Sequence, residues 1–139
     1  MFQMGAELSV QVKAAQQDPA SHDFCVHHQK IKRNEAADKV KQLAKSVPLL
    51  EKLTVQESRL KIIPDNLALF QNLKQLCIIN NLLETVPGSI GKLASLHELI
   101  LRDNRLTKLP NELLQLSGLK TLDLSLNQIN GLPQPADYA

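Results

Sequence analysis

The sequence repeats itself every 23 residues, with Leu50, Leu73, Leu96 and Leu119 each opening the same pattern. The four segments are LEKLTVQESRL (50–60), LKQLCIINNLL (73–83), LHELILRDNRL (96–106) and LKTLDLSLNQI (119–129). All fit L-x-x-L-x-L-x-x-N-x-L, allowing aliphatic exchanges and Ser58 in place of the first Asn. A repeat of this length restricts the chain to an array of similar units, each of which buries its apolar side chains against its neighbours.

The second half of each repeat begins with an aliphatic residue followed by proline. These pairs are Ile63-Pro64, Val86-Pro87, Leu109-Pro110 and Leu132-Pro133. In the first three copies two more apolar residues follow, namely Leu67 and Phe70, Ile90 and Leu93, and Leu113 and Leu116. Because proline fixes φ and has no N–H to donate, this half cannot extend a sheet and is predicted to return as a loop or short helical turn.

The x-L-x-L-x centre of each repeat predicts a short strand with its leucines on one face. Stacked coils then form a parallel sheet that covers an aliphatic core. Asn81, Asn104 and Asn127 follow three of the strands, where their amides would satisfy backbone groups at a buried turn. The predicted fold class is α/β: a right-handed solenoid with a curved parallel sheet on its concave side and loops or short helical turns on its convex side.

Residues 50–133, with these recurring Leu, Asn and Pro positions, resemble the leucine-rich-repeat family, specifically its intracellular 23-residue type found in Ras-suppressor-like scaffolds. The resemblance implies a protein–protein interaction module that binds a protein partner on its concave face, without enzymatic activity or a cofactor. The last repeat is incomplete, because Ala136 and Ala139 stand where a fourth tail would place larger apolar residues. We therefore assign residues 134–139 to a C-terminal tail.

A degenerate first repeat is predicted over residues 21–49. In DFCVHHQKIKR (23–33), Phe24 and Val26 replace the strand leucines, Gln29 the Asn and Ile31 the next apolar residue. The following segment, NEAADKVKQLAKSV, has its apolar residues at helical spacing, with Asn34 as N-cap and Pro48 after its end. This repeat therefore carries a longer helix in place of the aliphatic-Pro turn.

Residues 1–20 are predicted to form an N-terminal capping helix, because Leu8, Val12 and Ala15 have helical spacing and Asp18-Pro19 marks a boundary. A strand is the alternative, because Leu8, Val10 and Val12 also alternate.

The strand residues between the leucines are expected to face solvent and to stack into columns from coil to coil. One column is Cys25, Thr54, Cys77, Ile100 and Asp123, and the next is His27, Gln56, Ile79, Arg102 and Ser125. Isoleucines at these positions, beside charged residues, are typical of an interface anchor with a polar rim. The predicted partner-binding residues are Gln56, Cys77, Ile79, Ile100, Arg102, Asp103 and Asp123. Ordinary surface variation is the alternative.

The cluster His22, Cys25, His27 and His28 raises the alternative of a zinc site. Strand parity opposes it, because His22 and His28 would lean away from the face that carries Cys25 and His27. We therefore predict no metal site, and no catalytic Cys25–His27 pair, because an open strand offers no pocket that excludes water. Cys25 and Cys77 would lie roughly 9–10 Å apart, too far for a disulfide.

The chain carries 16 Lys and Arg against 14 Asp and Glu, a balance that favours neither nucleic acid nor membrane as a partner. The basic stretch of Lys30, Lys32, Arg33, Lys39, Lys41 and Lys45 is predicted to be a solvated helix face. With two cysteines, no Asn-x-Ser/Thr sequon and no apolar run long enough for a signal peptide or membrane span, the expected location is the cytoplasm, with the nucleus as an alternative.

Two further hypotheses concern assembly. The chain could be the recognition segment, or a fragment, of a larger scaffold or of a ubiquitin-ligase receptor. The last strand could also be an open edge through which the chain associates with itself.

Overall fold

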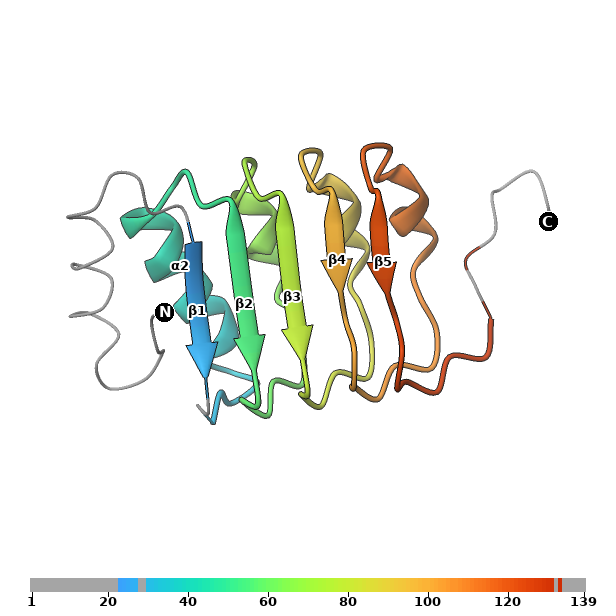
Figure 1. Ribbon diagram of the computed structural model, residues 1–139. Helices are drawn as coiled ribbons and strands as arrows, with labels where there is room; N and C mark the ends of the chain where they lie inside the picture. The colour runs from blue at the N-terminus through green and yellow to red at the C-terminus, as the bar shows by residue number, and fades with distance from the viewer. Residues whose placement is uncertain (1–22, 28–29, 132, 134–139) are drawn as a thin grey trace.

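A computed structural model of the chain describes residues 23–27, 30–131 and 133. Five strands form one parallel sheet in the order β1-β2-β3-β4-β5, and a helix and three 3-10 turns lie behind it (Figure 1). In chain order the elements are β1 (Asp23–His27), α2 (Ala36–Ser46), β2 (Lys52–Gln56), η1 (Asp65–Leu69), β3 (Gln75–Ile79), η2 (Gly88–Lys92), β4 (Glu98–Ile100), η3 (Asn111–Gln115) and β5 (Thr121–Asp123). This arrangement confirms the predicted α/β solenoid.

The strand register follows the sequence repeat. Leu53 lies beside Leu76, Leu76 beside Leu99, and Leu99 beside Leu122, each pair 23 residues apart. The first pair of strands has a longer offset, with Phe24 beside Leu53, because α2 lengthens that coil. The strand leucines turn inward, and Leu76 and Leu99 are fully buried in the aliphatic core.

The convex side consists of the segments that begin with proline. Pro64, Pro87 and Pro110 stand immediately before η1, η2 and η3, with φ between −71° and −72°. That value is the one that the pyrrolidine ring imposes, and it suits the start of a helical turn. The predicted loop or short helical turn is therefore a 3-10 turn in each of these three repeats.

Consecutive coils are joined by an asparagine ladder along the edge where the strands end. The Asn81 Oδ1 accepts hydrogen bonds from the backbone N–H groups of Ser58 (3.0 Å) and Leu60 (3.1 Å). Its Nδ2 donates to the backbone oxygens of Val55 and Ile79, both at 2.9 Å. One buried side chain thus satisfies four backbone groups that the turn would otherwise leave without partners.

The next two repeats use the same arrangement. Asn104 Oδ1 accepts from Leu83 N–H at 3.2 Å, and Asn127 Oδ1 accepts from Leu106 N–H at 3.0 Å. The first 23-residue repeat has Ser58 instead, which is fully buried and donates its hydroxyl to the Gln56 carbonyl oxygen at 2.8 Å.

A left-handed residue precedes the ladder position in every 23-residue repeat. Glu57, Asn80, Asp103 and Leu126 have φ between 50° and 57°, and Arg59 has φ 54°. Asn and Asp tolerate this region best, because their short polar side chains bond locally. Its recurrence at one repeat position shows that the turn geometry is imposed by the coil and not by the residue type.

Helix α2 packs one apolar stripe against the sheet, with Ala36, Val40 and Leu43 buried. The prediction that Asn34 caps it was wrong by one residue: the N-cap is Glu35, and no side chain caps the helix. The Glu35 N–H instead donates to the Lys32 carbonyl oxygen at 3.0 Å, so a backbone turn leads directly into the helix. Val47, just before Pro48, ends the helix as predicted.

Two convex turns, η2 and η3, approach each other closely at Gly91. A Cβ atom at this position would lie 2.6 Å from the backbone oxygen of Glu112 in η3. Such a contact is too short for real carbon atoms, so only glycine allows the two turns to sit at this spacing.

Several predictions lie outside the described residues. They are the capping helix over residues 1–20, the roles of His22, His28 and Gln29, and the tail over residues 134–139. In the part that the structure describes, no helix has the length and apolar character needed to cross a membrane.

Candidate partner-binding surface

The face of the sheet opposite the core carries three columns of side chains. The strand register places Cys25 beside Thr54, Thr54 beside Cys77, Cys77 beside Ile100, and Ile100 beside Asp123. A second column runs from His27 to Gln56 to Ile79, and a third contains Asp23, Lys52, Gln75, Glu98 and Thr121. These side chains point away from the leucine core because residues alternate along a strand.

Three apolar residues, Cys77, Ile79 and Ile100, lie together in the middle of this face, and we call them the apolar centre. Cys77 and Ile100 are register partners on β3 and β4, and Ile79 lies two residues beyond Cys77. All three are half-buried, since the neighbouring columns cover their sides. The isoleucines are therefore less exposed than the sequence predicted, although they still face the open side of the sheet.

The other predicted site residues surround the apolar centre. Gln56 is half-buried and is the register partner of Ile79, and Asp123 is the register partner of Ile100. Arg102 and Asp103 are exposed and follow β4 after Leu101. The Arg102 backbone oxygen accepts a hydrogen bond from Asn80 N–H at 3.1 Å, which fixes this segment beside the end of β3.

Asp123 is held as a carboxylate by its own turn. The Ser125 hydroxyl and backbone N–H both donate to Asp123 Oδ1, at 2.6 and 2.9 Å. These hydrogen bonds, with a smaller contribution from the Arg102 charge, lower the pKa of Asp123 below its ordinary value. The surface therefore keeps a fixed negative charge next to Ile100.

The two cysteines are free thiols on the central column, separated by Thr54. Burial raises the pKa of Cys25, and burial together with the Glu98 carboxylate raises the pKa of Cys77. Both thiols are therefore protonated at neutral pH, and a protonated thiol is a poor nucleophile and a poor metal ligand.

The histidine and cysteine cluster is only partly within the described residues. Cys25 is buried and His27 is half-buried on β1, whereas His22 and His28 lie outside those residues. Among residues 23–27 and 30–131, no three His, Cys, Asp or Glu side chains are grouped closely enough to hold a metal ion.

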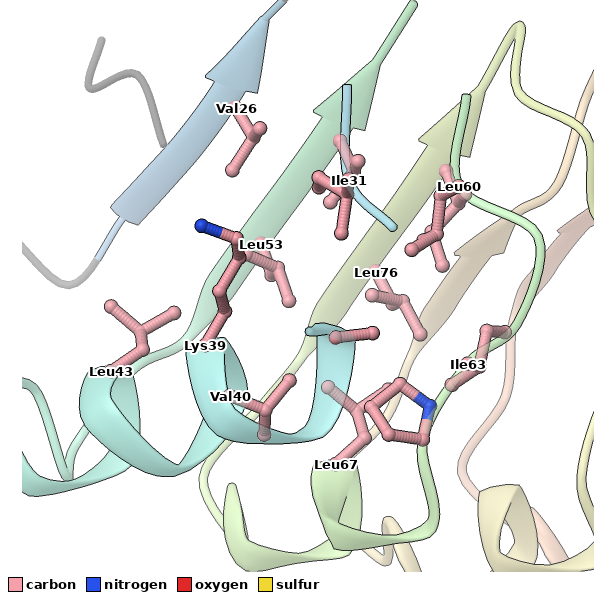
Figure 2. Close-up of a pocket in the computed structure, with 14 residues that line it drawn as sticks. Val26, Ile31, Lys39, Val40, Leu43, Leu53, Leu60, Ile63, Leu67 and Leu76 are labelled. Atoms are coloured by element: carbon pink, nitrogen blue, oxygen red, sulfur yellow. The ribbon is translucent and has the colours of Figure 1, made fainter. Parts of the chain in front are cut away.

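Sequence reasoning missed a cavity between α2 and the sheet. It has a volume of about 40 Å³, and α2 contributes Lys39, Val40 and Leu43 to its walls (Figure 2). Ala36 of α2 also lines it, and the remaining lining comes from the sheet and from the segments that follow β1 and β2, with Val26, Ile31, Leu53, Val55, Leu60, Ile63, Pro64, Leu67, Leu76 and Ile78. Because its lining is aliphatic apart from Lys39, the cavity offers no polar partners for an ordered water.

The comparisons with known proteins agree with this geometry. A family model described as leucine rich repeat matches residues 94–136. No curated protein matches the chain by sequence.

Solved structures with the same fold come from a bacterium and a plant. The Leptospira interrogans LRR protein LIC12759 is 28% identical, with 79% of this chain and 32% of that chain covered and a TM-score of 0.58. The LRR ectodomain of the receptor kinase SOBIR1 from Arabidopsis thaliana is 32% identical, with 60% and 45% covered and a TM-score of 0.52.

A chain from the BIR3–SERK2 complex of Arabidopsis thaliana is 23% identical, with 84% of this chain and 57% of that chain covered and a TM-score of 0.59. The chain thus spans between about a third and somewhat over half of the length of these three structures. Residues 94–136 thus match the leucine-rich-repeat family model, and the parallel sheet and stacked coils give the chain the leucine-rich-repeat fold.

Proposed function

We propose that this protein is a non-enzymatic interaction module that binds a protein partner on the concave face, with Ile79, Ile100 and Arg102 at the centre of the contact. Leucine-rich-repeat solenoids typically act as protein–protein interaction modules, because their curvature creates an extended concave surface. The observation that supports this face is the apolar centre, where three apolar residues occupy adjacent positions on a surface that water would otherwise cover.

The residues around the apolar centre fit the rim of an interface. Arg102 and Asp103 are exposed, and Asp123 keeps its charge next to Ile100. In protein interfaces, a few central residues supply most of the binding energy, and a polar border excludes water and selects the partner. Gln56 and the charged residues therefore contribute specificity, while the apolar centre contributes affinity.

The test is a charge introduced at the apolar centre. The double variant Ile79→Asp and Ile100→Asp should lose the partners that wild-type protein captures from native lysate, as identified by mass spectrometry. The matched control is Leu69→Asp with Leu114→Asp, because these leucines are 56% and 50% exposed on the convex turns. Circular dichroism should show that both variants keep the fold. Partner loss in the control variant alone would refute the proposal and assign binding to the convex side.

Self-association through β5 is a second candidate, favoured by exposed leucines at that end of the solenoid. Leu122 is 40% exposed and Leu126 is 63% exposed. Asp123 and Ser125 turn their backbone oxygens toward β4, where Leu101 and Asp103 donate to them, so the backbone groups of Leu122 point away from the sheet. Among the described residues no strand pairs with β5 on this side, and an open strand edge beside exposed leucines is a template for another strand.

Sedimentation distinguishes the two candidates. Self-association requires a dimer of wild-type protein that Leu122→Lys converts to a monomer, while Leu114→Lys on the convex side leaves the dimer intact. A wild-type protein that remains monomeric at high concentration would contradict self-association without affecting the proposal for the concave face.

For the location in the cell we propose the cytoplasm, supported by the free thiols of Cys25 and Cys77. Fractionation of cells that express the full-length protein tests this. That the chain is the recognition segment of a larger scaffold or ubiquitin-ligase receptor stays a prediction, and mass spectrometry of the endogenous protein tests it.

A further inference from the structure

Two neighbouring coils bring five cations together at the edge where the strands end. Ile31 N–H donates to the Ser58 backbone oxygen at 3.0 Å, so the segment after β1 runs directly beside the segment after β2. Ile31, Ser58 and Leu60 are buried, which turns the residues between and around them outward. The exposed residues are Lys30, Lys32, Arg33, Arg59 and Lys61, and we call them the basic edge.

The basic edge does not continue along the solenoid. Leu82 N–H donates to the Leu60 oxygen at 2.9 Å, so the next coil continues the same stack. In that coil, however, Leu82 and Glu84 occupy the repeat positions of Arg59 and Lys61. In the third coil only Arg105 remains as a cation at these two positions, because Thr107 takes the other.

The small net charge of the whole chain does not reveal that its cations are concentrated in one segment. Nine of the 16 Lys and Arg residues but only four of the 14 Asp and Glu residues lie between residues 30 and 61. This segment therefore has a net charge of +5, and the rest of the chain has −3, which gives the formal +2 of the whole. Such an asymmetry creates a positive surface potential at one end of the solenoid.

In the described part of the chain, the acidic residues near the basic edge do not form ion pairs with its five cations. The acids between residues 30 and 61 are Glu35, Asp38, Glu51 and Glu57. Within residues 23–27 and 30–131, none of the five cations is in an ion pair, and the ion pair found there joins Lys74 to Glu51 at 3.1 Å. Five exposed and unpaired cations on two adjacent segments therefore present a binding surface for an anionic partner.

The chemistry of the edge favours an acidic protein segment over other polyanions. The aromatic side chains in the described part, Phe24 and Phe70, are 1% and 0% exposed, so nucleic acid bases would find no surface on which to stack. Among the described residues, no exposed large apolar side chain lies in residues 30–33 or 58–61, so the edge has no group to insert into a membrane. An extended acidic chain needs neither exposed aromatic rings nor exposed apolar side chains, since its carboxylates pair with Lys and Arg at the surface.

We propose that the basic edge is a docking surface for an acidic segment of a partner protein, separate from the apolar centre of the concave face. Each coil contributes one row of cations, and an extended segment lies along the two rows. The contact is electrostatic, so it weakens with salt, whereas a contact at the apolar centre does not depend on salt in this way.

The test measures binding of a fluorescein-labelled peptide of alternating glutamate and aspartate to the full-length protein by fluorescence anisotropy. We expect Arg59→Glu to raise the dissociation constant about tenfold, because it replaces an attraction with a repulsion at an exposed site. The matched control is Arg105→Glu at the same repeat position two coils away, with less than about a twofold effect. Lys61→Glu repeats the test at a position with a different backbone conformation.

Three results would overturn the proposal. Equal weakening by Arg59→Glu and Arg105→Glu would mean that only the net charge matters. Binding that is unchanged between about 0.05 and 0.5 M salt would exclude an electrostatic contact. Binding of duplex DNA or of phosphatidylserine vesicles in place of the peptide would assign the edge to a different partner. The peptide should bind normally to the Ile79→Asp and Ile100→Asp variant, so this test is independent of the proposed function.

Discussion

The side-chain nitrogen of Asn104 donates a hydrogen bond of 2.8 Å to the backbone oxygen of Ile78, 26 residues earlier in the chain. This bond crosses from one coil to the preceding one, whereas a β-strand ladder joins only backbone groups. Because Asn81 and Asn127 make the equivalent bonds to Val55 and Leu101, polar side chains as well as leucines join the coils.

Replacing Asn104 with alanine should therefore destabilise the protein strongly. The variant leaves the Leu83 N–H and the Ile78 oxygen without their partners in a buried place, and we expect the free energy of unfolding to fall by about 3 kcal/mol. Urea unfolding followed by circular dichroism measures this. Asn72→Ala, at an exposed position, should change stability by less than about 0.5 kcal/mol. Similar losses in both variants would contradict the role of the ladder.

Leu99 tests the packing of the core. It is fully buried between register partners Leu76 and Leu122, and Leu99→Ala should cost about 2–5 kcal/mol because it creates a cavity. Lys108→Ala, on an exposed side chain, is the control and should cost little. If thermal unfolding shifts equally in both variants, the strands do not bury their leucines as described.

The sequence predicted most of the inward-facing residues because those residues recur at a fixed spacing along the chain. The leucines, prolines and asparagines recur at 23-residue intervals, and the coils stack at the same interval, so Leu53, Leu76, Leu99 and Leu122 lie side by side. The 23-residue spacing does not predict features that depend on contacts between coils of different length. The basic edge is one of these, because the bond between Ile31 and Ser58 joins residues 27 apart, outside the repeat.

The site was less predictable than the fold. The sequence placed Cys77, Ile79 and Ile100 on the face opposite the core, but it did not predict that they are half-buried. The helix cap differed for a similar reason, since the turn from Lys32 to Glu35 depends on how the first coil passes behind the sheet and not on the side chain of Asn34.

Filling the cavity beneath α2 should stabilise the protein. Val40→Ile adds one methylene group to a lining residue, and burial of that group is worth about 0.8 kcal/mol. The same change at Val47, which is buried but does not line the cavity, should be neutral or destabilising because that site is already filled. Differential scanning calorimetry of the two variants provides the comparison. A loss of stability in Val40→Ile would indicate that the space closes in solution.

The ionisation of Asp123 should depend on Ser125. The folded-state pKa of Asp123 lies below its unfolded value, so the carboxylate contributes stability above the unfolded pKa, and this contribution disappears as the pH falls below about 4. Ser125→Ala removes the hydroxyl bond but keeps the backbone N–H bond, and it should raise the pKa part of the way. A carbon-detected NMR titration of the carboxyl group measures this. Ser117→Ala, at an exposed position on the convex side, should leave the titration unchanged.

Gly91 lies on the side of the molecule that faces away from the sheet, yet it affects the shape of the opposite side. A Cβ at Gly91 in η2 would lie 2.6 Å from the backbone oxygen of Glu112 in η3, and in a stack of wedge-shaped units the thickness at the back determines how strongly the front curves. A methyl group at this point would push two wedges apart at the back and tighten the arc. Substitutions on the convex side can therefore change the curvature of the proposed concave binding surface without contacting a partner.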